Sequence, residues 1–287
     1  MPPLDLLPEL TEEQESKCAE IEKRKVINAR KNAGRRNWLT LHRAHERILA
    51  RPVYYMFREQ GKRIAKTIAA GSPARFALES FSVGTETQEL LQELSPRLER
   101  TMLIGALSMR ESISMKKWMD GDDLSRYAID LPSTIISGIR AAMRELVAQK
   151  YWSSIAQWSK QNMAKIIDAG IQAGASNKEI AKRLRSATSG NLAKQRALVI
   201  ARSEVTGALN RGHLESLNEL ASHEPAKKRW SAILDQRTRD SHAQLSGQSI
   251  PVDEKFSNGG RFPGDPFLPA SERANCRCVL IADVSLF

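Results

Sequence analysis

Apolar residues recur at helical spacing along most of the chain. Between residues 133 and 151 they stand at positions i, i+4, i+8, i+11, i+12 and i+16, which places them on one face of a single helix. The same periodicity predicts further helices within the first 75 residues, over 86–119, from Trp152 to about Gly170, and from Ala193 to Leu220. The pattern is that of a mainly helical protein.

Local signals indicate where these helices begin and end. Gly71-Ser72-Pro73 predicts a break, and Asp120–Asp123 predicts a loop. Pro52 is expected to interrupt the first helical region, because proline cannot donate the backbone hydrogen bond of a helix interior. Ser176 followed by Glu179 forms a capping box, which predicts that a new helix begins there.

The helical periodicity ends near Pro225. Beyond it the chain is rich in proline and glycine, and only short β-type stretches remain, such as Lys228–Leu234 and Cys278–Ala282. The predicted fold is mainly α: a helical N-terminal body with a small, loop-rich α+β C-terminal module. The predicted divisions are an acidic tail (1–16), a basic helical region (17–160), the helical part of a C-terminal domain (161–225) and its α+β module (226–287).

Charge is distributed unevenly along the chain. The net charge is +11 at pH 7, whereas residues 17–75 alone carry sixteen bases against four acids, a net charge of +12. A helical segment this basic favours a polyanion or an acidic protein surface as its partner, and the alternative is a solvated face that only aids solubility. The bases expected to bind nucleic acid or an acidic partner are Lys23, Arg24, Lys25, Arg30, Lys31, Arg35 and Arg36.

Composition excludes several classes of protein. No run of about 18 apolar residues occurs, so no membrane partner is expected. The acidic start of the chain does not resemble a secretory signal. The three cysteines, Cys18, Cys276 and Cys278, are too few for a disulfide framework. We therefore expect a protein made in a reducing cytoplasm.

Unusual polar motifs cluster in the second half of the chain. They run from Arg202-Ser203-Glu204 through Asp235-x-Arg237-Thr238-Arg239-x-x-His242 to Asn275-Cys276-Arg277-Cys278. In order and spacing they resemble the Mu F-like head morphogenesis domain of phages over roughly residues 165–282, with Ser203 where that family more often has threonine. The positions that carry this resemblance are Arg202, Glu204, Trp230, Asp235, Arg237, Thr238, Arg239, His242, Gly247, Pro263, Asp265, Asn275, Cys276, Arg277 and Cys278.

The resemblance implies a phage minor head protein that acts in capsid assembly, associated with the portal vertex and with DNA packaging or delivery. Its partners would be the portal protein and other capsid proteins, with packaged DNA as a further candidate partner of the basic segment. It would lie in the head of the virion after assembly in the host cytoplasm. It would not be an enzyme.

The C-terminal cluster also contains metal-ligating residue types. His242, Cys276 and Cys278 are zinc-type donors, with Asp235 as a candidate fourth ligand. A loop-rich module of about 60 residues has little core and would gain from a structural zinc ion. The other interpretation needs no cofactor: two buried cysteines and a hydrogen-bonded histidine inside a polar interior.

The same cluster allows two alternative functions. Arg237, Arg239 and His242 could serve a nuclease-like or nucleotide-handling enzyme, with Glu204 as a further catalytic candidate. A DNA-binding regulator is the other, because a helix that begins at Ser176 and is followed by another helix resembles a helix-turn-helix. The intervening segment, 185–192, is too long for the usual tight turn.

If the cluster is structural instead, each charged residue needs a partner. Asp235 would cap the turn that follows it, and Glu204 would pair with an arginine of the C-terminal module. Arg237 or Arg239 would pair with Asp265 or Glu272, and His242 would bind a loop carbonyl. Arg202 would face outward or toward the edge of the module.

Overall fold

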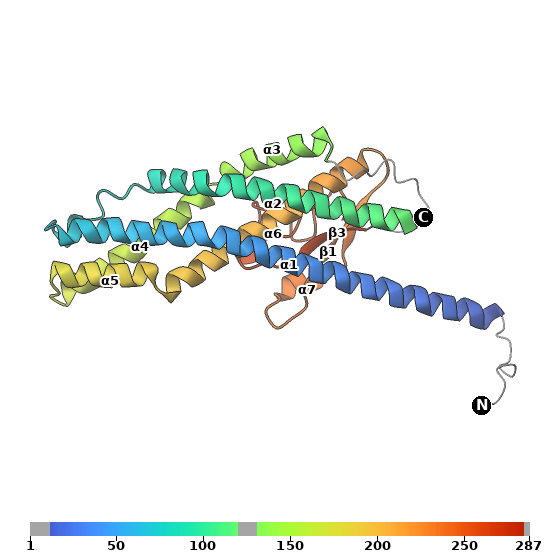
Figure 1. The fold of residues 1–287 in the computed structure, drawn as a ribbon, viewed down its shortest axis with the longest axis horizontal. Helices are drawn as coiled ribbons and strands as arrows, with labels where there is room; N and C mark the ends of the chain where they lie inside the picture. Colours follow the sequence, from blue (N-terminus) through green and yellow to red (C-terminus); the bar gives the residue numbers. More distant parts are fainter. Residues whose placement is uncertain (1–11, 120–130, 284–287) are drawn as a thin grey trace, which may run out of the picture. The chain divides into compact units, whose positions relative to one another are not determined.

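The computed structural model describes the backbone of residues 12–119 and 131–283 and the side chains of residues 38–113 and 131–283. These ranges form a mainly helical fold with one small sheet, which confirms the predicted fold class (Figure 1). The elements are α1 (Glu12–Ala69), η2 (Ala74–Phe76), α2 (Val83–Met119), α3 (Ser133–Val147), α4 (Tyr151–Gln172), α5 (Asn177–Ser189), α6 (Asn191–Ala221), β1 (Lys227–Ser231), α7 (Asp240–Leu245), β2 (Ser249–Pro251), α8 (Ala270–Arg273) and β3 (Val279–Ala282).

The chain divides into two compact units, Met1–Leu41 and His42–Phe287. All positions that carry the Mu F-like resemblance lie in the second unit. Among the described helices, none combines the length and the apolar character that a membrane crossing requires.

Most predicted helix signals are confirmed, and two are wrong. The single helix expected over 133–151 is one of these, because α3 ends at Val147 and Tyr151 begins α4. The Ser176 hydroxyl accepts a hydrogen bond from the Glu179 N–H at the start of α5, as a capping box requires. Pro52, however, does not interrupt α1. Val53 and Phe57 follow it on a buried face, and this burial offsets the roughly 3 kcal/mol that an interior proline costs a helix. Asp120–Asp123 lies outside the described residues.

Helix α6 is central to the second unit. It packs along α2 and also contacts β3 (Figure 1). The approach to α2 is close: a Cβ atom added at Gly212 would lie 2.0 Å from the Met102 carbonyl oxygen, and one added at Gly105 would lie 2.4 Å from the Leu209 carbonyl oxygen. Two glycines, one on each helix, therefore set the distance between the two backbones.

The C-terminal module is built on a three-stranded antiparallel sheet with the order β2-β1-β3. The register places Trp230 of β1 opposite Leu280 of β3. Both side chains are buried in one apolar cluster with Phe256, Phe262 and Leu217, the last of which comes from α6. The strands predicted from sequence exist, although β1 ends earlier than expected, and β2 was not predicted.

The connection between α5 and α6 differs from the prediction. The two helices are separated only by Gly190, so the long segment expected over 185–192 is wrong. Between Ser203 and Leu217 every α6 residue is buried except Gly207 and Arg211, which are half-buried, so this part of α6 has no face free to enter a DNA groove. The first turns of α6 do expose side chains, among them Lys194 and Gln195.

Candidate functional site

Polar side chains on one face of α6 bind the backbone of the Cys-x-Cys segment. Thr206 Oγ1 donates a hydrogen bond to the Cys276 carbonyl oxygen. Asn210 Nδ2 donates to the Cys278 carbonyl oxygen over 3.0 Å, and Asn210 Oδ1 accepts from the Leu280 N–H over 2.8 Å. Side chains of α6 therefore make the backbone hydrogen bonds that a neighbouring strand would otherwise make. In this way α6 positions both cysteines through their main chain.

The same face of α6 extends to Ser203 and His213. Ser203 Oγ accepts a hydrogen bond from the N–H of Asn275, the one non-glycine residue with positive φ (59°) among the described residues. His213 Nδ1 lies 2.7 Å from the Leu280 carbonyl oxygen, and His213 Nε2 lies 3.1 Å from Ser108 Oγ of α2. Sequence reasoning missed this stripe. Polar residues at spacings of three and four within an otherwise apolar helix could have indicated it.

Burial lowers the pKa of His213 to about 4, although its hydrogen bond to Leu280 acts in the opposite direction. The neutral ring donates through Nδ1 to Leu280 and accepts at Nε2 from Ser108. Protonation would place a charge among buried groups and remove the acceptor at Nε2.

This histidine is expected to make the stability of the fold depend on pH. Its folded-state pKa lies below that of the unfolded chain, so stability that is present above pH 6.5 is lost as the pH falls toward 4. The shift corresponds to about 3 kcal/mol at most. His213→Gln keeps an amide donor but cannot be protonated in this range. Its free energy of unfolding in urea should therefore fall less than that of wild type between pH 7 and 4.5. His223→Gln, at an exposed position, is the matched control, and identical pH slopes for wild type and His213→Gln would contradict the assignment.

The Pro263-Gly264-Asp265 loop lies directly on α6. The Pro263 carbonyl oxygen accepts from Asn210 Nδ2 over 2.9 Å. Gly264 has φ of +83°, and its carbonyl oxygen would lie 2.8 Å from a Cβ atom added at Gly207 of α6. Glycine is needed at 264 for this conformation and at 207 for this approach.

The Asp235 turn ties β1 to the Cys-x-Cys segment. Asp235 Oδ1 accepts from the Arg237 N–H over 3.0 Å, which confirms the predicted cap, and from Arg277 over 2.6 Å. These two hydrogen bonds lower the pKa of the Asp235 carboxyl well below its usual range. Thr238 closes the turn by donating to the Ile233 carbonyl oxygen. Asp235 is thus committed to the turn, and the prediction that it is a fourth metal ligand is wrong.

The predicted partners of Arg237 and Arg239 are also wrong. Arg239 donates to the Ala274 carbonyl oxygen, and Arg237 lies 3.5 Å from Asp235. Asp265 is taken by Arg261, which stands four residues before it in the same loop. A partner this close in sequence orders less chain than a distant one, so it satisfies the carboxylate at lower entropic cost.

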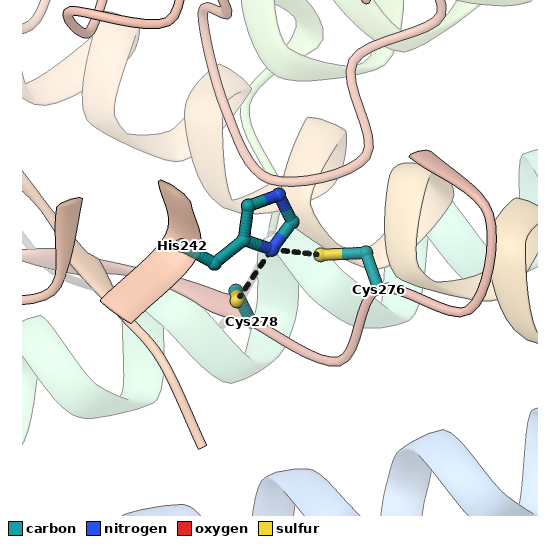
Figure 2. A group of neighbouring side chains, drawn as sticks. All are labelled: His242, Cys276 and Cys278. Atoms are coloured by element: carbon teal, nitrogen blue, oxygen red, sulfur yellow. Dashed lines mark hydrogen bonds between the residues drawn. The ribbon is translucent and has the colours of Figure 1, made fainter. Parts of the chain in front are cut away.

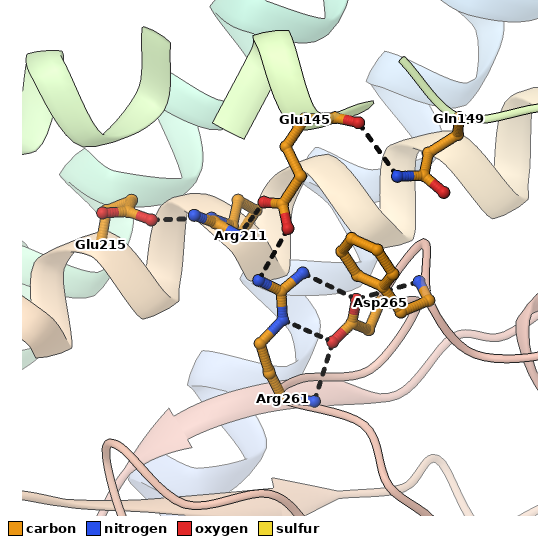
Figure 3. A network of polar contacts seen from close by, with 7 residues as sticks. Glu145, Gln149, Arg211, Glu215, Arg261 and Asp265 are labelled. Atoms are coloured by element: carbon orange, nitrogen blue, oxygen red, sulfur yellow. Dashed lines mark hydrogen bonds and ion pairs between the residues drawn. The ribbon is translucent and has the colours of Figure 1, made fainter. Parts of the chain in front are cut away.

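Arg261 also belongs to a larger network (Figure 3). Its guanidinium lies 3.0 Å from Glu145 of α3, and the same carboxylate accepts from Arg211 of α6 over 3.0 Å. Arg211 further donates to Glu215 over 2.7 Å. The loop that holds Asp265 is therefore fastened to two helices of the helical body.

Glu204 is buried and pairs with an arginine of the C-terminal module, as predicted. Its Oε1 accepts from Arg273 of α8 over 3.0 Å, and its Oε2 accepts from the Tyr151 hydroxyl over 2.7 Å. Burial raises the pKa of Glu204, while Arg273 and Tyr151 act against that rise. The cavity beside Glu204 and Arg273 measures about 20 Å³, which is room for about one water molecule.

Arg202, two residues away, faces the edge of the module as predicted. Its guanidinium donates to Asn275 Oδ1 over 3.0 Å and to Glu46 Oε1 of α1 over 2.5 Å. Gly247, just after α7, has φ of +96°, and its N–H donates to the Trp230 carbonyl oxygen over 2.8 Å. Arg202 thus links α6 to α1 and to the segment before β3, whereas Gly247 links the end of α7 to β1.

His242, Cys276 and Cys278 converge in the interior of the module (Figure 2). The ring Nδ1 lies 3.4 Å from Cys278 Sγ and 3.7 Å from Cys276 Sγ, and both cysteines are free and buried. The Nε2 atom on the other side of the ring lies 3.0 Å from Glu272 Oε2. The prediction that His242 binds a loop carbonyl is therefore wrong.

The protonation states within this cluster depend on one another. The pKa of the Cys278 thiol is lowered because Cys276 donates to it and because His242 lies beside it, whereas the pKa of Cys276 is raised by the same contact with Cys278 and by burial. Burial lowers the pKa of His242, but Cys278 and Glu272 outweigh that effect and raise it overall. The cluster favours a thiolate at Cys278.

The remaining predicted site residues lie in the first unit. Lys23, Arg24, Lys25, Arg30, Lys31, Arg35 and Arg36 fall within α1, and their side chains are outside the described residues.

The positions that carry the Mu F-like resemblance are called the signature residues below. The fold and the site define a class of helical protein in which an α+β C-terminal module is bound to helix α6, in part through these residues. Residues 161–281 match the family described as Phage Mu protein F like protein. The chain thus contains a segment, less than half of its length, that is similar to the Mu F-like family.

Relatives of several kinds share parts of the chain. It is 36% identical over 124 residues to the Minor head protein GP7 of Bacillus phage SPP1, a match that covers 42% of this chain and 39% of that protein. It is 29% identical over 221 residues to the NAD(+)--arginine ADP-ribosyltransferase EFV of Enterococcus faecalis, covering 70% of this chain and 42% of that protein. It is 31% identical over 141 residues to the uncharacterized protein YqbB of Bacillus subtilis, covering 46% of each. The chain thus spans less than half the length of each of these relatives, and no solved structure matches it significantly.

Proposed function

We propose that this chain is a phage minor head protein that joins the assembling head at the portal vertex and acts there without catalysis. Portal protein and other capsid proteins are its partners, and its place is the head of the virion. The observation that carries this proposal is the match of residues 161–281 to the Mu F-like family, together with the 36% identity over 124 residues to a minor head protein.

The use of the signature residues supports a structural role. Glu204, Asp235 and Asp265 all accept hydrogen bonds from arginines, and the His242 ring is buried between Glu272 and two cysteines. A nuclease-like site would instead present its arginines and a histidine to a phosphate in an open cleft. A hollow of about 720 Å³ between α1 and α2 is lined by none of the signature residues.

The activity in the name of the Enterococcus relative is not carried over. This chain covers 42% of that protein, so more than half of the relative has no counterpart here. Glu204 and Arg273, which are paired with each other, line a cavity of about 20 Å³, which is too small for a nucleotide.

The basic segment supports contact with a polyanion. Its charge is of one sign over several helical turns, which suits packaged DNA or an acidic capsid surface better than an interspersed solvated face would. We assign packaged DNA as the partner, because a protein at the portal vertex lies beside the packaged genome.

The assembly role is tested in the head itself. In cells producing phage from a genome that lacks this gene, a tagged copy supplied in trans should co-purify with the portal protein and appear at low copy in purified heads by quantitative mass spectrometry. Absence from both the portal complex and the heads would overturn the proposal.

A matched pair of variants tests the basic segment. Replacing Lys23, Arg24 and Lys25 with glutamine should lower the amount of packaged DNA or the infectivity of the particles, while the protein still enters heads. Lys178, Lys182 and Arg185, three exposed bases in or beside α5, receive the same change as the control. Equal effects of the two triple variants would remove the case for a specific contact.

A further inference from the structure

We propose that His242, Cys276 and Cys278 bind one zinc ion that holds the C-terminal module together. The three donors come from two segments that are far apart in sequence, α7 and the strand entry before β3, and their ligand atoms all lie within 4.8 Å of one another. All three side chains are buried, and their donor atoms face a common point (Figure 2).

The distances match the geometry that zinc imposes. With Zn–S of about 2.3 Å, Zn–N of about 2.05 Å and tetrahedral angles, a ring nitrogen and a thiolate sulfur on one ion stand about 3.6 Å apart. The observed separations of His242 Nδ1 from the two sulfurs are 3.4 and 3.7 Å, on either side of that value. The three side chains could therefore coordinate one zinc ion without a large movement of the backbone.

The histidine is oriented as metal-binding histidines are. Its Nε2–H points to Glu272 Oε2 at 3.0 Å, which leaves Nδ1 with a lone pair directed at the two sulfurs. Ser241 Oγ in turn donates to both oxygens of Glu272, over 3.2 and 3.3 Å. A carboxylate–histidine pair of this kind fixes the tautomer and raises the basicity of the ligating nitrogen.

A buried indole provides an independent sign that an electron-rich sulfur belongs here. Trp230 is fully buried, and its Nε1–H has no hydrogen bond of normal geometry among the described residues. The Trp230 ring packs edge-on against the His242 ring, with centroids 5.4 Å apart, and it lies in one buried cluster with both cysteines. A metal-bound thiolate would give this orphaned donor the acceptor that a neutral thiol provides only weakly.

The frame around the cysteines is already in place. Thr206 and Asn210 of α6 hold the carbonyl oxygens of Cys276 and Cys278, and Asn275 turns the chain through a left-handed conformation just before them. Two sulfurs are therefore presented by backbone that is fixed without the metal. Binding would release the thiol protons to solvent.

Donor chemistry selects the ion. Two thiolates and one imidazole are ligands for zinc and are poor ligands for magnesium or calcium, which take oxygen donors. His242, Cys276 and Cys278 supply three of the four tetrahedral positions. The inference does not rest on the proposed function, because every ligand belongs to this chain.

The test uses the full-length protein purified through a tag without histidine. We expect about one zinc ion per chain by plasma mass spectrometry. After removal of zinc, Co²⁺ should bind with the thiolate-to-metal absorption that two sulfur ligands produce. Preparations that contain no zinc, and that show no such absorption with Co²⁺, would overturn the proposal.

Variants assign the ligands. Cys278→Ser should abolish stoichiometric zinc, whereas Cys18→Ser, the same change outside the cluster, should leave it intact. Because Cys278→Ser risks misfolding, Glu272→Gln provides a milder change that keeps a hydrogen-bond acceptor for the ring. It should weaken zinc affinity about 10- to 100-fold in a competition titration with a chelator. Unchanged affinity in Glu272→Gln and in folded Cys278→Ser would place the metal elsewhere.

Discussion

Arg273→Met is expected to lower the free energy of unfolding by about 4 kcal/mol, because removing one partner from a buried ion pair leaves the other charge uncompensated. Arg273 lies 3.0 Å from Glu204 and 4.1 Å from the centre of the Tyr151 ring, and both charged side chains are buried. Methionine retains most of the length of arginine, so the loss reports the charge more than the packing. Urea unfolding at pH 7.5 measures it.

The size of this loss should depend on pH in a definite direction. Burial already raises the pKa of Glu204, and Arg273 opposes that rise, so the variant raises the pKa of Glu204 further. A carboxyl whose folded-state pKa is raised loses stability as the pH rises through the window between its unfolded and folded values. The difference between wild type and Arg273→Met should therefore be smaller at pH 5 than at pH 7.5.

Two further variants separate the buried charge from other effects. Arg273→Met combined with Glu204→Gln removes both charges and should recover most of the stability, since a buried ion pair replaced as a whole is often nearly neutral. Arg237→Met is the matched control, because Arg237 is exposed and its 3.5 Å contact with Asp235 is a surface ion pair worth less than about 1 kcal/mol. A loss of similar size in both arginine variants would refute the role assigned to Arg273.

Gly212→Ala is expected to destabilise the protein by about 3–4 kcal/mol, a large effect for one added methyl group. In a free helix the same change would gain about 1 kcal/mol. Here the new Cβ would lie 2.0 Å from the Met102 carbonyl oxygen and 2.7 Å from the Ala106 nitrogen, both backbone atoms of α2. Since neither can rotate away, α2 and α6 must separate along the core that they share.

Gly84→Ala is the control for this prediction. Gly84 also lies in α2, but a Cβ atom there meets only Ser82 Oγ at 3.8 Å, so alanine should be neutral or slightly stabilising. Urea midpoints at constant pH compare the two variants. A Gly212→Ala protein as stable as wild type would mean that α2 and α6 do not pack as closely as the structure has them.

Local sequence was sufficient for most of the secondary structure. The i, i+4 spacing of Ile135, Ile139 and Met143 is a property of one helix face, and the Ser176–Glu179 capping box is complete within four residues. Such signals depend on neighbours along the chain, so they can be read without knowing the fold. The same holds for Asp235, whose cap acts on a residue two positions away.

Other features depend on contacts that the chain makes only when folded. Between Ser203 and Leu217 helix α6 is buried on almost every side, so its periodicity does not reveal that Thr206, Asn210 and His213 bind a segment some 70 residues later. Pro52 remains inside α1 because tertiary burial outweighs a local preference.

The sequence by itself determined the helical class, the change near Pro225 from long helices to short strands and loops, and the Mu F-like motif, because each depends on local spacing and residue type. Only the tertiary structure decided which arginine meets which carboxylate, and that His242 turns one nitrogen to Glu272 and the other to two cysteines. Charge pairing is chosen by distance and burial after the helices have packed. Because the chain has several arginines and several carboxylates, the sequence alone could not say which of them pair.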